Sequence, residues 1–202
     1  MRFDDRGVTD QFSLDLLGGF AVRRGERAVE LPPACQRLVA LLALKRRPVH
    51  RLWVCAMLWP HTQTRRAVAS LRSTMWRLRP AGADPLLLVD PQYVALSSDV
   101  TVDWHHATDH IDRLLDHDEP AEADPQLVAD LLPLLRAGDL LDGWAEKWVV
   151  RERVRYRTMR TAALESIERG PETQVPQYAC ASIRSVLPHR PVGIVRNDSS
   201  QP

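Results

Sequence analysis

Charge is segregated along this chain of 202 residues, and that segregation limits what its two halves can do. Residues 31–83 contain ten lysines and arginines and no acidic residue, whereas residues 99–146 contain thirteen acidic residues and only two arginines. The two blocks nearly cancel, so the formal net charge is only +1. A basic block beside an acidic block predicts a half that binds a polyanion joined to a second unit. The alternative is that the two charged faces pair with each other.

Length and composition are those of an ordinary globular chain of one or two domains, with 45% hydrophobic residues. Residues 1–11 contain no apolar run of the signal-peptide type, and the longest apolar run, residues 38–44, is too short to span a bilayer. We therefore expect a cytoplasmic protein that does not contact a membrane. Cys35, Cys55 and Cys180 are widely spaced and are expected to be small core residues.

Prolines divide the first half into short elements. Apolar alternation within residues 12–22, followed by a glycine turn, predicts a small N-terminal β-meander. A helix is expected over residues 33–46, because Pro33 suits the first turn and Pro48 stops the pattern. A second, short helix is ended by Pro60.

A third helix and a hairpin complete the first half. Helical spacing extends over residues 63–78, and two apolar runs over 86–96 flank a turn at residues 90–92. A meander, three helices and a C-terminal hairpin together predict an α+β winged helix-turn-helix over residues 12–100.

The third predicted helix has two faces of opposite character. Projection at 100° per residue places Val68, Leu71, Met75 and Leu78 in one stripe, which is expected to face the core. The opposite face holds Arg66, Ala69, Ser70, Ser73 and Arg77. Small polar side chains allow a helix to lie close in a major groove, where arginine can bond the guanine edge. The alternative interpretation is an exposed, arginine-rich helix with no ligand.

The second half is predicted to be helical throughout. Apolar residues at helical spacing lie over residues 111–115, 127–135 and 144–168, with a proline-containing loop at 119–125. Residues 171–202 include five prolines and are expected to form a poorly ordered tail.

Four short motifs fall on the predicted helices in a definite order. The first two are Val49-x-Arg51-x-x-Val54-x-x-x-Leu58-Trp59-Pro60 and Leu71-Arg72-x-x-x-Trp76-Arg77-Leu78-Arg79. The other two, in the second half, are Gly143-Trp144 and Trp148-Val149-Val150-x-Glu152-Arg153. The first pair resembles the winged helix of Streptomyces antibiotic regulatory protein (SARP) family activators. The second pair resembles the start of the bacterial transcriptional activation domain that follows it in that family, so the resemblance covers about residues 14–170.

This resemblance implies a fold and a function. The fold is an OmpR-type winged helix followed by a shortened, tetratricopeptide-like helical domain over residues 101–170, with residues 1–11 as an N-terminal extension. The function is binding to direct-repeat promoter sites on double-stranded DNA, where a homodimer is one arrangement, and recruitment of RNA polymerase to secondary-metabolite genes. The third helix then becomes the recognition helix. The DNA contacts that the resemblance implies fall on Arg65, Arg66, Ala69, Ser70, Arg72, Ser73 and Arg77, with the wing at Gln92 and Tyr93.

Two departures from the family pattern bear on these expectations. The family often has a glycine where Gln92 precedes Tyr93, so the wing tip is expected to differ in shape. The family's activation domain continues for several helices beyond the point that corresponds to Gly170, where this sequence becomes rich in proline. A promoter competitor that does not activate transcription is therefore an alternative to an activator.

Other candidate sites have simpler interpretations. His106 and His110 have a spacing that can hold a metal ion, but together with His105 and His117 they are expected to form a solvated face. The six tryptophans are expected to pack in the core and not to stack on single-stranded nucleic acid. No phosphate-binding loop, nucleophile elbow or Cys-x-x-Cys pair occurs. We therefore expect no enzyme activity, no cofactor, no metal and no small-molecule substrate.

The sequence thus predicts a regulator that binds double-stranded DNA at specific sites. Phosphate contacts are expected from Arg46, Arg47, Arg51 and Arg65, and discrimination between sequences from the face that runs from Arg66 to Arg77. The alternative is a protein-interaction module whose basic half docks on an acidic partner, or on the acidic half of another copy, without touching DNA. Preference for one duplex over a scrambled one distinguishes the two hypotheses, because steep salt dependence is common to both.

Overall fold

The computed structural model of the chain describes residues 11–116 and 124–169. The predicted tail, His117, Cys180 and all but Gln11 of the predicted N-terminal extension lie outside the described residues. None of the described helices is both long enough and apolar enough to cross a membrane.

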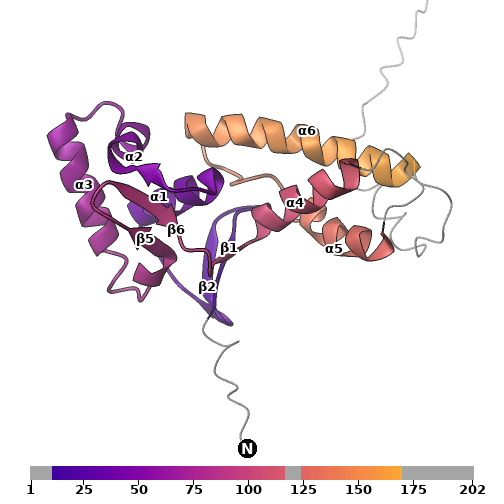
Figure 1. Cartoon of the computed structure of the whole chain (residues 1–202), viewed down its shortest axis with the longest axis horizontal. Helices are drawn as coiled ribbons and strands as arrows, with labels where there is room; N and C mark the ends of the chain where they lie inside the picture. The colour runs from indigo at the N-terminus through magenta and orange to yellow at the C-terminus, as the bar shows by residue number, and fades with distance from the viewer. Residues whose placement is uncertain (1–10, 117–123, 170–202) are drawn as a thin grey trace, which may run out of the picture.

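The N-terminal sheet contains the predicted meander and one further strand (Figure 1). β1 (Phe12–Asp15), β2 (Ala21–Arg24) and β3 (Arg27–Ala28) pair antiparallel in chain order. β7 (Thr101–Val102) pairs parallel with β1 and gives the sheet order β3-β2-β1-β7. The segment that follows the predicted winged helix is therefore itself part of the first sheet.

Three helices follow the meander. α1 (Pro33–Lys45) has proline in its first turn and ends at Arg46, which has the left-handed conformation with φ 50°. α2 (Arg51–Leu58) ends before Pro60, and α3 (Thr64–Trp76) ends two residues earlier than the sequence pattern predicts.

A second small sheet contains the predicted hairpin. A short 3-10 turn (Asp84–Leu86) leads into β5 (Leu87–Val89), which pairs antiparallel with β6 (Tyr93–Leu96). β4 (Val49–His50), between α1 and α2, adds a third strand on the other side of β6, and β6 packs against α1. This order of small sheets and helices is consistent with a winged helix followed by a helical unit.

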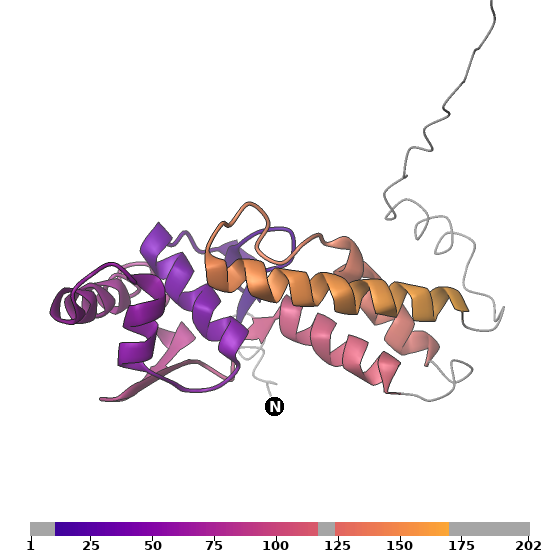
Figure 2. The same cartoon turned by 90° about the horizontal axis from the view of Figure 1, so that it is seen from above.

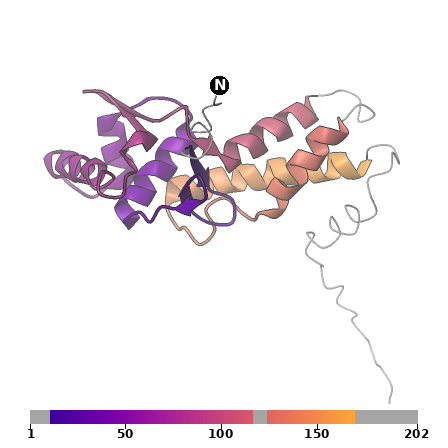
Figure 3. The ribbon, with the colours of Figure 1, turned by 90° about the horizontal axis from the view of Figure 1, so that it is seen from below.

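The second half consists of three helices in the part of the chain that the structure describes. They are α4 (Asp103–Leu115), α5 (Pro125–Arg136) and α6 (Lys147–Arg169). α4 packs against both α5 and α6, and α6 runs beside α4 toward α1 (Figure 2). α3 lies at one end of the molecule and α5 at the other (Figures 1 and 3).

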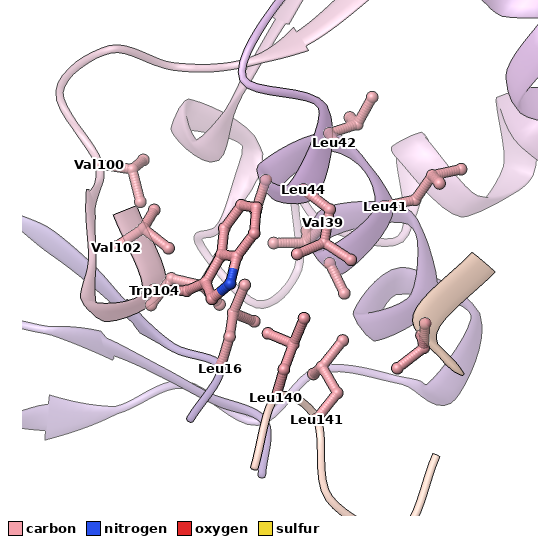
Figure 4. Packing of buried hydrophobic residues seen from close by; sticks show 14 of the residues in the cluster. Leu16, Val39, Leu41, Leu42, Leu44, Val100, Val102, Trp104, Leu140 and Leu141 are labelled. Atoms are coloured by element: carbon pink, nitrogen blue, oxygen red, sulfur yellow. The ribbon is translucent and has the colours of Figure 1, made fainter. Parts of the chain in front are cut away.

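One hydrophobic core continues through both halves. Figure 4 shows Trp104 of α4 packed near Leu16, which follows β1, and near Leu140 and Leu141, which lie between α5 and α6. Val39 of α1 belongs to the same buried cluster. The first and second halves therefore share apolar contacts and are not separated by an extended linker.

Backbone hydrogen bonds join the same region. The Leu141 N–H donates to the Leu16 carbonyl at 2.6 Å, and the Gly18 N–H donates to the Asp139 carbonyl at 2.7 Å. Gly18 has a φ of 78°, and a Cβ atom there would lie 2.3 Å from the carbonyl oxygen of Ala137. Only glycine fits at this position without backbone movement.

Asp103 provides the polar contact of this junction. Its Oδ1 accepts hydrogen bonds from the N–H groups of Leu16 (2.8 Å) and Trp104 (2.6 Å), and its Oδ2 accepts one from Leu17 (2.9 Å). Burial raises the pKa of the Asp103 carboxyl, and the three backbone N–H groups oppose that shift. A carboxylate at the start of α4 thus satisfies the backbone where β1 ends.

Candidate nucleic-acid interface

α3 is anchored by a row of small and aliphatic side chains. The buried residues of this segment are Ala67, Leu71, Thr74 and Leu78. The predicted core stripe is confirmed at Leu71 and Leu78, whereas Val68 and Met75 are only partly buried. Thr74 can take a core position because its hydroxyl donates a hydrogen bond to the Ser70 carbonyl at 2.8 Å. The Cys35 Sγ of α1 donates to the Thr74 carbonyl at 3.3 Å, so the two helices lie close together there.

The opposite face of α3 carries the predicted DNA-contact residues. Arg65, Arg66, Ala69, Arg72, Ser73 and Arg77 are exposed, and Ser70 is half-buried. None of the four arginines forms an ion pair with an acidic residue in the described ranges. The first turn of α3 contains no acidic residue, and Gln63 provides no side-chain cap, so the positive end of the helix dipole is also uncompensated. This face is positively charged and open to solvent.

Arg77 lies at the end of this face and not at its centre. It is the C-cap residue of α3, and it is near enough to Cys35 to lower the pKa of that thiol slightly, against the larger rise caused by burial. A rise of 1.5 Å per residue separates Arg65 from Arg77 by about 18 Å along the helix axis. The two arginines therefore reach different parts of any ligand laid against α3.

Trp76 is a surface residue that sequence reasoning missed. Its exposed fraction is 64%, and it follows Arg72 and Ser73 by one helical turn, on the exposed face. The prediction that the tryptophans pack in the core is wrong for Trp76 and for Trp53, whose exposed fraction is 36%, although Trp104 and Trp148 are buried as expected. A helical projection of the sequence places Trp76 with the arginines, and that signal could have identified it.

The wing is tied to the start of α2. The Arg51 N–H donates to the Gln92 carbonyl at 2.8 Å, and the Arg51 Nη1 donates to the Asp90 carbonyl at 3.3 Å. Asp90 Oδ1 accepts hydrogen bonds from the N–H groups of Tyr93 (2.6 Å) and Gln92 (2.7 Å), which lower the pKa of the Asp90 carboxyl. The turn is thus ordered around a carboxylate.

The strands of the wing expose apolar side chains on either side of the polar turn. Leu88, Val89 and Tyr93 have exposed fractions of 56%, 51% and 42%, and residues 86–97 include no lysine or arginine. The positive charge next to the wing turn comes from Arg51, whose Nη1 donates to the Asp90 and Pro91 carbonyls. The structure therefore brings Gln92 and Tyr93 next to Arg51, on a wing that lacks positive charge of its own.

The basic residues of α1 face the acidic half. Arg46 forms a bidentate pair with Asp109 of α4, with nitrogen–oxygen distances of 2.6 and 2.7 Å. Lys45 lies 3.8 Å from Glu152 of α6. The pairing of the two halves, weighed as an alternative from the sequence, thus occurs at α1, where Arg46 is engaged by a carboxylate.

Arg37 of α1 is also paired with a described acidic residue, whereas Arg47, just after α1, is not. Arg37 pairs with Glu146 at 3.1 Å and also donates to the Leu58 carbonyl at 3.0 Å, at the end of α2. Arg47 is exposed and forms no ion pair with any described residue. Of the predicted phosphate contacts, Arg65 and Arg47 are uncompensated, Arg51 supports the wing, and Arg46 is paired.

The histidines of α4 have different surroundings. The His105 Nε2 lies 2.8 Å from the Ala43 carbonyl, and burial lowers the pKa of this imidazole. The rings of His106 and His110 lie 6.3 Å apart. Within residues 11–116 and 124–169, no three His, Cys, Asp or Glu side chains gather in a way that could hold a metal ion.

Comparison with known proteins adds little to this picture. No protein-family model matches the chain, and no curated protein matches it either. Among solved structures, Mycobacterium tuberculosis EmbR in complex with a low-affinity phosphopeptide is similar, with a TM-score of 0.49 and 22% sequence identity. The similarity covers 77% of this chain and 42% of that one, so this chain spans less than half the length of the EmbR structure. A likeness at this level assigns neither a family nor a function, and SARP membership stays a prediction.

Proposed function

We propose that this protein is a cytoplasmic transcription regulator of the SARP type that binds double-stranded promoter DNA through α3 and is not an enzyme. The observation that supports this most directly is the exposed face of α3, where four arginines without acidic partners surround small side chains. An α-helix about 10–12 Å in diameter matches a major groove about 12 Å wide. Small residues such as Ala69 and Ser73 let the backbone approach the base edges.

In this proposal some residues of α3 contact phosphates and others contact base edges. Arg65 and the uncapped N-terminus of α3 bind phosphate, because helix N-terminal N–H groups and arginine both attract phosphate oxygens. Arg66 reads base edges, since the residues that contact bases concentrate in the first turns of a recognition helix. Ser73 lies two turns further along the same face and contacts the base edges or the backbone there. Arg77, at the far end, contacts either a base or the backbone. With the apolar wing beside it, α3 supplies most of the charge of the interface.

The family resemblance extends this proposal to the second half. α4, α5 and α6 then belong to a shortened, tetratricopeptide-like activation domain that contacts RNA polymerase at secondary-metabolite promoters, with direct repeats as the sites and a homodimer as one arrangement. A promoter competitor that binds without activating is the alternative within the same class. Transcription in vitro with and without the protein, on a template that it binds, distinguishes an activator from a competitor.

The test of DNA binding compares a fragment from upstream of the protein's own gene with a scrambled duplex of equal length, at physiological salt with competitor DNA. We expect strong preference for the native fragment. Arg66→Ala is expected to weaken binding to that fragment by about 1–3 kcal/mol and to reduce the preference. Arg136→Ala is the matched control, because Arg136 is exposed and belongs to α5, which lies at the opposite end of the molecule from α3. Equal binding to both duplexes, or equal effects of the two substitutions, would refute the proposal.

A second candidate function is a protein-interaction module that does not bind DNA. The exposed apolar wing favours it, because Leu88, Val89 and Tyr93 offer a surface suited to a protein partner and carry no cation for phosphate. The same binding experiment separates the two functions: a protein that prefers neither duplex supports the interaction module.

A further inference from the structure

α6 presents one face to solvent along its whole length. Its 23 residues make it about 34 Å long. Val149, Tyr156 and Ala163 are buried and mark the inner side of α6, which packs against α4 (Figure 1). The opposite side carries two series of exposed residues spaced by seven: Lys147, Val154, Thr161 and Glu168, with Arg151, Thr158 and Glu165 between them. A spacing of seven keeps residues on one face of a helix, where a second helix can pack.

The charge on this face changes sign along the helix. Lys147 and Arg151 lie in the first two turns, and Glu165 and Glu168 lie in the last two. None of these four residues forms an ion pair with any residue that the structure describes. Arg169, at the end of α6, is turned back on the helix, where its Nε donates to the Glu165 carbonyl at 3.1 Å. The face therefore has a basic first half and an acidic second half, both uncompensated within the described chain.

This order of charges is unfavourable for α6 on its own. The helix dipole favours acidic side chains near the N-terminus and basic ones near the C-terminus, and this face has the reverse order. A partner helix whose charges run in the opposite direction would compensate them. A second copy of α6, laid antiparallel, is such a partner, because its Glu165 and Glu168 then lie against Lys147 and Arg151.

The middle of the face carries no charge. Val154 has an exposed fraction of 58%, and Thr158 and Thr161 are also exposed. Thr158 lies seven residues from Arg151 on one side and seven from Glu165 on the other, so it marks the centre of the charge pattern. Side chains of this size allow two helices to approach closely at that point.

We propose that two copies of this chain associate through α6, with the two helices antiparallel and a two-fold axis near Thr158. Each copy contributes the same residues to such an interface, which requires a self-complementary surface. The charge pattern supplies that complementarity, because each pair of opposite charges occurs twice. This two-fold dimer differs from a head-to-tail arrangement on direct repeats, and it does not depend on DNA.

The size of the interface sets the expected strength. A single pair of helices of this length buries less than the roughly 800 Å² per partner of a standard protein–protein interface. The dimer is therefore expected to be weak and reversible, with a dissociation constant on the order of 10–100 μM.

Sedimentation equilibrium of the full chain, over concentrations that bracket this dissociation constant, tests the proposal. Two double variants reverse the charge at either end of the face: Lys147→Glu with Arg151→Glu, and Glu165→Arg with Glu168→Arg. Each variant alone places like charges opposite each other in the homodimer, and its dissociation constant should rise at least about tenfold. An equimolar mixture of the two variants restores every opposite-charge pair, and it should form a heterodimer about as stable as the wild-type dimer. Both reversals agree with the helix dipole, so α6 should remain folded in each variant.

A matched control separates this contact from general attraction between oppositely charged chains. Arg27→Glu with Arg136→Glu reverses two exposed arginines outside α6 and changes the net charge by the same amount as the Lys147 and Arg151 variant. The control should dimerise like the wild type, and it should form no heterodimer with the Glu165 and Glu168 variant.

Four results would overturn the proposal. A wild-type chain that stays monomeric would leave this face to a different partner, and double variants that dimerise like the wild type would place the contact elsewhere. A mixture that does not restore association would exclude the antiparallel arrangement, and an equal loss in the control would show a general effect of charge. None of these results bears on DNA binding, because the variants leave α3 unchanged.

Discussion

Replacement of Asp103 tests how the two halves are held together. Asp103→Ala removes the acceptor of the Leu16 and Leu17 N–H groups, which have no other acceptor within residues 11–116 and 124–169. Each buried N–H left without a partner costs about 1–3 kcal/mol. Burying the Asp103 carboxylate is itself unfavourable, so its removal offsets part of this loss of stability. The expected net loss in the free energy of unfolding is about 2–4 kcal/mol.

A loss of that size is large beside the total stability of a domain, about 5–15 kcal/mol. For a chain of this length it corresponds to a fall in Tm of roughly 4–16 °C, measured by circular dichroism. Asp103→Asn keeps one carbonyl oxygen and should give an intermediate fall. Asp116→Ala is the matched control, because Asp116 is exposed at the other end of α4 and its side chain has no partner among the residues that the structure describes. A Tm for Asp103→Ala equal to that of the control would show that the carboxylate does not support the junction.

Three further predictions follow from other sites. The Arg157 guanidinium lowers the pKa of Asp139 in the folded protein. The pair therefore stabilises the fold at any pH above the ordinary pKa of about 3.8, and this contribution is lost as the pH falls through the lower pKa of the folded state. Asp139→Asn should make the fall of Tm at acid pH less steep, and an unchanged fall would contradict this. Tyr156→Phe should raise the free energy of unfolding by roughly 1 kcal/mol, because burial without a hydrogen-bond partner raises the pKa of Tyr156 to about 12 and leaves its hydroxyl unsatisfied; a clear loss in urea denaturation would instead reveal a partner. Trp76→Ala should change stability by less than about 0.5 kcal/mol but weaken DNA binding by at least roughly 1 kcal/mol; undiminished binding would place Trp76 outside the interface.

Local sequence signals determined most of the elements in the first half. Pro33, Pro48 and Pro60 act within one turn of the backbone, so α1 and α2 begin and end close to the predicted positions. The hairpin turn at residues 90–92 also follows from short-range patterning. The exposed face of α3 was predictable because helical geometry alone separates Leu71 and Leu78 from the arginines.

Contacts between distant segments decided the rest. β4 and β7 are two residues long and exist only because β6 and β1 offer hydrogen bonds, which no periodic pattern records. Asp103 reads in the sequence as one acid of an acidic block, yet folding places it against the backbone after β1.

The candidate site shows the same division. The sequence alone predicts that α3 is basic and amphipathic. The pairing of Arg46 with Asp109 depends on how α1 and α4 come together. The sequence by itself determined the helices, their faces and the separation of charge, because these depend on neighbours within a few residues. Tertiary structure alone decided which charges are neutralised, because an ion pair depends on the distance between side chains that lie far apart in the chain.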